Sequence, residues 1–156
     1  MTKTYRQGAV GAMMDEYERA IAELLRILEG ISDEEFERIR DTKTQDENCR
    51  SIQTILTHVV SAGYGYAGML RDAWGAARGD PKREPFARAD ASARIRKMLD
   101  YTSATLEGKW NLTEAEMEAV QMRSRWGPMY DFEQIFEHAI VHVLRHRRQI
   151  ERFLGR

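Results

Sequence analysis

Histidine is the side chain whose number and placement in this sequence point most directly to chemistry. His58 stands alone in the first half of the chain, while His138, His142 and His146 recur at every fourth residue near its end. At about 100° per residue, helical positions four apart differ in direction by only about 40°, so these three form one stripe. Neutral imidazole nitrogen is a common ligand of transition metals. The four histidines therefore indicate a divalent-metal site between two helices.

The rise of a helix limits which histidines can share an ion. Neighbours in the stripe are about 6 Å apart along the axis, and their imidazoles can converge on one ion with metal–nitrogen distances of about 2.1 Å. His138 and His146 are about 12 Å apart and cannot both bind the same ion without distorting the helix. Either adjacent pair can chelate, and His58 supplies a third nitrogen. Three protein ligands leave a position for water or substrate, which is typical of a catalytic site.

A structural role is the alternative interpretation of these histidines. A single histidine on the apolar side of a helix is more often a hydrogen-bonded core or rim residue than a ligand. Here every histidine of the chain falls in two segments, and one segment holds a triple repeat. That concentration favours the metal site.

Composition sets the broad class of protein. A chain of 156 residues with 42% apolar and 31% charged residues fits one globular domain, residues 1–156. A formal net charge of −1 gives no general attraction to nucleic acid or to an anionic membrane, so we expect neither as a partner. The single cysteine, Cys49, excludes an intramolecular disulfide and a cysteine-rich zinc site. With no apolar run of signal-peptide or membrane-spanning length, we expect a cytoplasmic location.

Apolar residues spaced three and four apart predict the helices that must position the histidines. We expect long amphipathic helices over residues 10–28, 49–74, 89–107 and 129–154. Capping boxes at Ser32 and at Thr113 predict a short helix from Asp33 to about Arg40 and a second short helical turn. No alternating strand pattern is found, and residues 123–128 are interpreted as a plain connector. This pattern favours an all-α four-helix bundle with short connecting helices.

The last histidine segment carries a family resemblance. Residues 138–150 read HAIVHVLRHRRQI, and residues 56–60 read LTHVV. The first run resembles the DinB-like superfamily of bacterial metal-binding bundles, in which the second member of a His-x-x-x-His pair begins a His-Arg-x-Gln-hydrophobic run. The second run is similar to the family's third histidine, near the middle of the second helix. The likeness extends to the helix order of almost the whole chain, although only these two motifs are distinctive.

The resemblance implies a ligand set and a fold. Carried over to this sequence, the ligands are His58, His142 and His146, with His138 beside the site and Gln149 in contact with a ligand. The implied fold is an up-down-down-up four-helix bundle with bound zinc or nickel, and relatives are frequently homodimers. Surplus aromatics such as Trp74 and Trp110, expected outside one core, would support a dimer.

Two functions follow from these expectations. The first is a metal-dependent enzyme, a thiol S-transferase or hydrolase acting on a small molecule; the resemblance suggests this reaction type, including low-molecular-weight thiols. His138 would then accept a proton or orient a ligand, and we assign no residues to an organic cofactor. Candidate pocket-lining aromatics are Tyr64, Tyr66, Trp126 and Tyr130. Candidate attractors of an acidic substrate are Arg145, Arg147 and Arg148.

The alternative is a non-catalytic, stress-related module in which the ion stabilises the bundle or a dimer. Neither the metal nor the substrate follows from the sequence.

Overall fold

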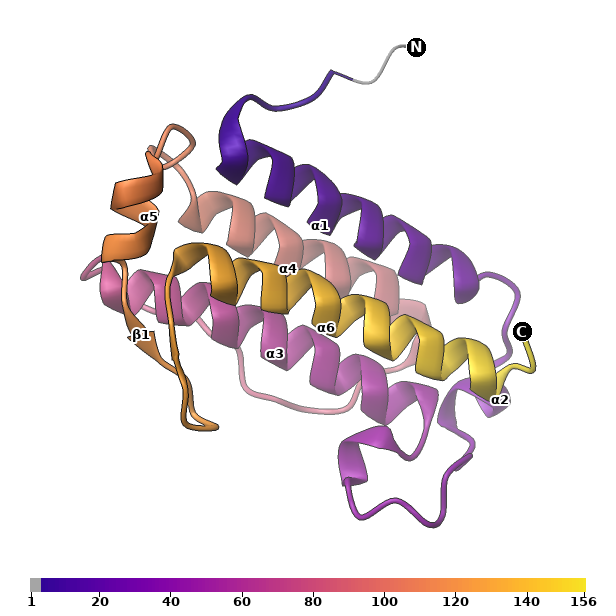
Figure 1. The fold of residues 1–156 in the computed structure, drawn as a ribbon. Coiled ribbons are helices and arrows are strands. Elements are labelled where there is room, and N and C mark those ends of the chain that lie inside the picture. The colour runs from indigo at the N-terminus through magenta and orange to yellow at the C-terminus, as the bar shows by residue number, and fades with distance from the viewer. Residues whose placement is uncertain (1–3) are drawn as a thin grey trace.

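The computed structural model describes residues 4–156 and is mostly helical in that range (Figure 1). The long helices are α1 (Gly8–Ile27), α3 (Ile52–Ala73), α4 (Ala91–Thr105) and α6 (Phe132–Phe153). The short ones are α2 (Asp33–Glu37) and α5 (Glu114–Ala119), with 3-10 turns η1 (Glu47–Cys49) and η2 (Arg88–Asp90). Two short strands, β1 (Met122–Arg123) and β2 (Met129–Tyr130), precede α6. The all-α prediction is confirmed.

The four long helices pack side by side, with α6 against α1 and α3, and α3 against α4 (Figure 1). Two contacts at different points along a pair of helices show whether the two helices run parallel or antiparallel. The pairs are Tyr17–Phe136 and Glu23–Arg147 for α1 and α6, Trp74–Phe132 and Cys49–Gln149 for α3 and α6, and Tyr64–Tyr101 and Arg71–Thr105 for α3 and α4. Helices α1 and α6 therefore run one way, and α3 and α4 run the other.

All four long helices contribute to one apolar core. Its fully buried members include Tyr17, Leu24, Ile55, Leu56, Leu70, Ile95, Met98, Phe132, Ile135 and Ile150. Trp74 and Trp110, expected outside a single core, are partly buried and pack against this one. They therefore do not form a surplus apolar surface. Among residues 4–156, no helix is both long and apolar enough to cross a membrane.

Side-chain caps set the first residues of the two helices that carry the histidines. Helix α6 begins at Phe132, three residues later than predicted, because Asp131 and Gln134 exchange capping hydrogen bonds with each other's backbone N–H groups. Helix α3 begins at Ile52 rather than at residue 49, because Ser51 and Thr54 form the same reciprocal pair. These caps fix where each helix starts and so which turn carries each histidine.

The predicted plain connector before α6 is instead a small β-hairpin, so the expectation of no strands was wrong here. Met122 pairs with Tyr130 and Arg123 with Met129, in antiparallel register. The turn contains Gly127 with a φ of 118°, a conformation that favours glycine. Strands of two residues are too short to leave an alternating pattern in the sequence. The hairpin matters because its tip carries Trp126 to the histidine stripe.

Candidate metal centre

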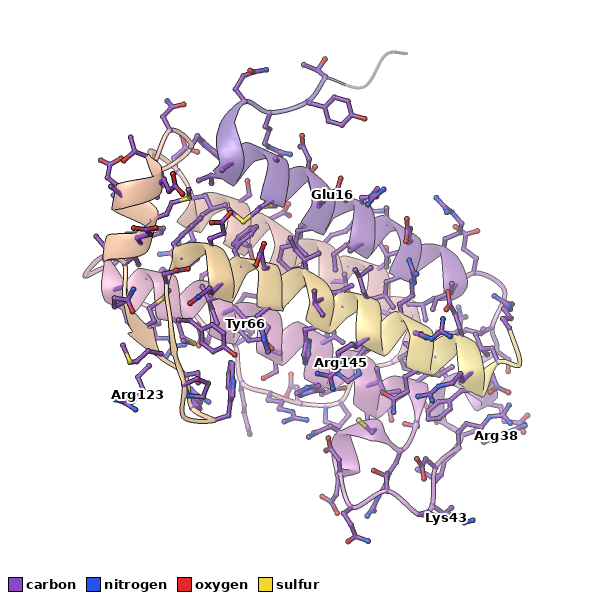
Figure 2. All side chains as sticks on the ribbon, viewed as in Figure 1. Glu16, Arg38, Lys43, Tyr66, Arg123 and Arg145 are labelled. Atoms are coloured by element: carbon purple, nitrogen blue, oxygen red, sulfur yellow. The ribbon has the colours of Figure 1, made fainter. Side chains whose placement is uncertain are left out.

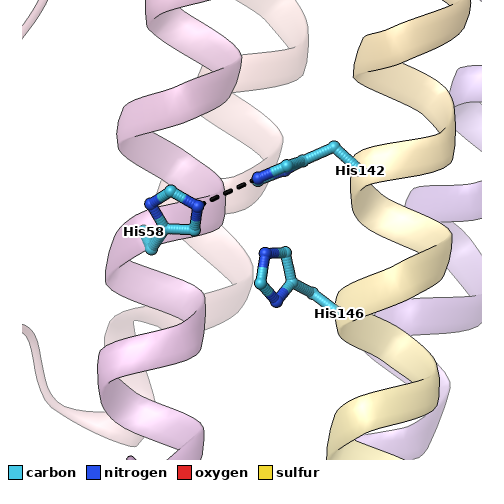
Figure 3. A group of neighbouring side chains, drawn as sticks. All are labelled: His58, His142 and His146. Atoms are coloured by element: carbon cyan, nitrogen blue, oxygen red, sulfur yellow. Dashed lines mark hydrogen bonds between the residues drawn. The ribbon is translucent and has the colours of Figure 1, made fainter. Parts of the chain in front are cut away.

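Three histidines from two antiparallel helices converge at one point (Figure 3). His58 lies in the second turn of α3, and His142 and His146 lie on successive turns of the facing α6. One nitrogen atom from each ring can be chosen so that all three lie within 4.8 Å of one another, and the Nε2 atoms of His58 and His142 are 2.9 Å apart. A tetrahedral ion with nitrogen ligands at about 2.1 Å separates those ligands by roughly 3.4 Å. The donor set therefore fits a divalent transition metal once the most distant nitrogens close by up to about 1.4 Å.

Gln149 fixes the orientation of one of these rings. Its side-chain Nε2 can only donate, and it faces the backbone carbonyl oxygen of Cys49 at 3.5 Å. Its Oε1 therefore faces His146, whose Nδ1–H donates to it at 3.1 Å. The Nε2 of His146 keeps its lone pair for an ion, an arrangement common among metal-binding histidines.

Burial keeps the three imidazoles neutral. His142 and His146 are buried, and loss of solvent is the largest cause of the lowered pKa of all three rings. The pKa falls to about 4 for His58 and to about 3 for His142, with the neighbouring imidazoles adding to the effect. Only an unprotonated nitrogen can bind a metal, so these rings are ready to do so at neutral pH.

His138 lies beside this group rather than in it. Its ring stacks on Trp126, with ring centroids 5.0 Å apart and planes at 24°, and it also contacts Tyr66 and Tyr130. Its centroid is 6.4 Å from that of His142. Of the two adjacent pairs that the spacing allowed, the structure brings His142 and His146 to His58.

A cavity of about 840 Å³ opens onto the three histidines between α3 and α6. Of the four candidate aromatics, Tyr66 and Trp126 line it. Tyr130 contacts Trp126 without lining the cavity, and Tyr64 packs against Tyr101 of α4. Gly65 also lines the cavity, and a Cβ atom there would meet nothing within 4 Å. The absent side chain thus leaves open space beside the histidines.

The charged lining differs in part from the sequence prediction. Arg145 and Arg148 line the cavity, but Arg147 does not, because it points toward α1 and pairs with Glu23 and with Glu151 on its own helix. The sequence reasoning missed several lining residues of connecting segments: Thr44, Asp46, Arg83 and Arg125. Helical periodicity, the main signal in the sequence, does not reach residues outside helices.

Comparison with known proteins identifies a family for this chain. No curated protein matches the chain. The family model described as the DinB superfamily matches residues 16–150, a span that contains all four histidines and nearly all of the four long helices. The match covers most of the chain and includes both histidine motifs. The chain is therefore a member of the DinB superfamily.

Proposed function

We propose that this protein is a metal-dependent enzyme, a thiol S-transferase or hydrolase acting on a small molecule, with zinc or nickel held by His58, His142 and His146. One observation carries the proposal: three neutral imidazoles converge at the wall of a cavity of about 840 Å³. Three ligands leave at least one coordination position facing that space. A purely structural zinc site normally has four protein ligands and no adjoining cavity.

The chemistry divides between the ion and the chain. An ion of this kind, when bound, lowers the pKa of a coordinated thiol or water so that it loses its proton near neutral pH. His138 lies one turn from His142, and burial lowers its pKa, so its imidazole is neutral and can accept that proton. Trp126 and Tyr66 both contact the His138 ring, which restricts its orientation.

The wider arrangement proposed is the family's up-down-down-up bundle assembled as a homodimer. The directions deduced above for α1, α3, α4 and α6 support the helix order. Trp74 and Trp110 do not support the dimer, because both pack against the core. Support for the dimer comes from α6, where Val141 and Leu144 are exposed apolar side chains on the outer face.

Elemental analysis of single-alanine variants tests the ligand assignment. Loss of metal from His58→Ala, His142→Ala and His146→Ala, with retention in His138→Ala, is the expected result. Retention in any of the first three variants would contradict the centre. Thiol-transfer or hydrolytic activity that survives complete metal removal would contradict the proposed chemistry.

A non-catalytic role is the second candidate, and a separate observation favours it. The ion would join α3 to α6 through two buried histidines, His142 and His146, and could act mainly to stabilise the bundle or a dimer. Calorimetry of the metal-loaded protein with several cellular thiols separates the two functions. Thiol binding that disappears in His142→Ala supports the enzyme, and the absence of thiol binding supports the module.

A further inference from the structure

The cavity beside the histidines has a strongly uneven charge. Five arginines line it, namely Arg83, Arg125, Arg145, Arg148 and Arg152, and the lining contains one carboxylate, that of Asp46. The chain as a whole has a net charge of −1, so this local excess does not reflect the overall composition. Low-dielectric walls around such a group of charges concentrate its field inside the cavity.

These guanidinium groups have no anionic partner within the part of the chain that the structure describes. The side chains of Arg125, Arg145, Arg148 and Arg152 make no ion pair or hydrogen bond with residues 4–156, and Arg83 bonds only the neutral amide of Asn48. Elsewhere, arginines such as Arg6, Arg78 and Arg147 pair with carboxylates. All five arginines are exposed and the lining contains a single carboxylate, so the cavity presents an excess of positive charge that an anionic ligand would balance.

Four of the five gather beside the C-terminal half of α6. Arg145, Arg148 and Arg152 are spaced three and four apart, so they share one face of α6. Arg83 lies near this face because its side chain donates to Asn48. The next residue, Cys49, accepts a hydrogen bond from Gln149 of α6 through its carbonyl oxygen. Figure 2 shows Arg145 nearer the C-terminal end of α6 and Tyr66 nearer the hairpin end. The aromatic side chains thus gather toward the hairpin, and these four arginines form the basic end of the cavity.

We propose that the basic end, Arg83, Arg145, Arg148 and Arg152, binds the anionic groups of a small substrate that carries two or more carboxylates or phosphates. Guanidinium groups match both anions through paired N–H donors, and a volume of about 840 Å³ suits a small molecule rather than a duplex nucleic acid. The anion site does not depend on the proposed function. Only the further statement that the reacting atom of this substrate lies at His58, His142 and His146 rests on the proposed function.

Four probes, three organic molecules and inorganic phosphate, separate the anion site from the metal chemistry. NMR-detected titrations use the full chain, metal-free and zinc-loaded, with succinate, mercaptosuccinate and 2-mercaptoethanol. The metal-free protein should bind succinate, and inorganic phosphate in a parallel titration, with affinity that falls as ionic strength rises. Mercaptosuccinate should bind the zinc-loaded protein more tightly than succinate does, because it adds a thiol for the ion. Failure of both succinate and phosphate to bind would overturn the anion site. A thiol that gives no gain with zinc would count against the proposed function alone.

Matched charge removals locate the site. Arg148→Gln and Arg152→Gln should each weaken mercaptosuccinate binding about tenfold while leaving the zinc content unchanged. Arg147→Gln is the control, because it removes the same charge from the same helix but its side chain pairs with Glu23 outside the cavity. An equal loss in the control, or no loss in the two cavity variants, would overturn the proposal.

Discussion

Gln149 offers a sharp test of how the centre is held. Its Oε1 accepts from Nδ1 of His146 at 3.1 Å, while its amide nitrogen donates to the Cys49 carbonyl at 3.5 Å. Gln149→Leu keeps a similar volume and removes both interactions. The ring of His146 then loses the acceptor that fixes its tautomer, and no other hydrogen bond to this ring is found among residues 4–156.

The size of the effect follows from that single lost contact. Removing a hydrogen-bond partner of a metal-binding histidine typically weakens metal affinity about 10- to 100-fold, or about 1.4 to 2.7 kcal/mol. Folding stability should change less, by about 1 kcal/mol, because water can reach the freed carbonyl of the half-buried Cys49. Competition for zinc with a chromophoric chelator measures the affinity, and urea unfolding of the metal-free protein measures the stability.

Gln149→Glu is the companion variant. A carboxylate still accepts from His146, so zinc affinity should stay near that of the unmodified chain although the bond to Cys49 is lost. The reasoning would be refuted if Gln149→Leu bound zinc as tightly as the unmodified protein. It would also be refuted if the leucine and glutamate variants lost affinity equally, since the Cys49 contact would then be the one that matters.

Three further outcomes are expected. Histidine in an unfolded chain has a pKa near 6.5, against about 4 for His58 and about 3 for His142 in the fold; the unfolded chain therefore takes up protons first as pH falls. Urea titrations of the metal-free protein should show stability level above about pH 7 and falling between about pH 6.5 and 4; constant stability across that window would contradict the burial of neutral rings. Removing zinc with a chelator should lower the thermal midpoint, since an ion at about 100 times its Kd adds about 2.7 kcal/mol, whereas His142→Ala should show no zinc-dependent change. Sedimentation should give twice the mass of one chain, with Val141→Glu shifting it toward monomer; a monomer at all concentrations would refute the dimer.

Helix spacing alone predicted much of the centre but not its ligand choice. The four-residue repeat showed that His138, His142 and His146 share a face and that only an adjacent pair can meet one ion. Which pair faces His58 depends on how far α3 is displaced along α6. End contacts such as Trp74 against Phe132 set that displacement, and a one-helix pattern contains no information about them. The family resemblance supplied the choice instead.

Prediction from the sequence was least accurate for residues outside helices and for the partners that each helix face contacts. Arg147 was grouped with Arg145 and Arg148, although it lies about 100° around the helix from Arg148 and about 160° from Arg145. Only the position of α1 shows that this direction leads to Glu23. Likewise, Arg83 and Arg125 reach the cavity from segments whose path has no periodic signal. The hairpin that carries Trp126 was not predicted for the same reason.

The chain builds its metal centre on helices and takes part of its cavity lining from connecting segments. The three imidazoles come from the interiors of long helices, whereas Arg83 lies in the connection after α3 and Trp126 at the hairpin turn. Connecting segments tolerate exchange and insertion far better than packed helices do. Grafting residues 75–87 or 124–128 from a relative should therefore alter which molecules enter while the ion stays in place. Such an architecture lets a lineage acquire new reactants without rebuilding its reaction centre.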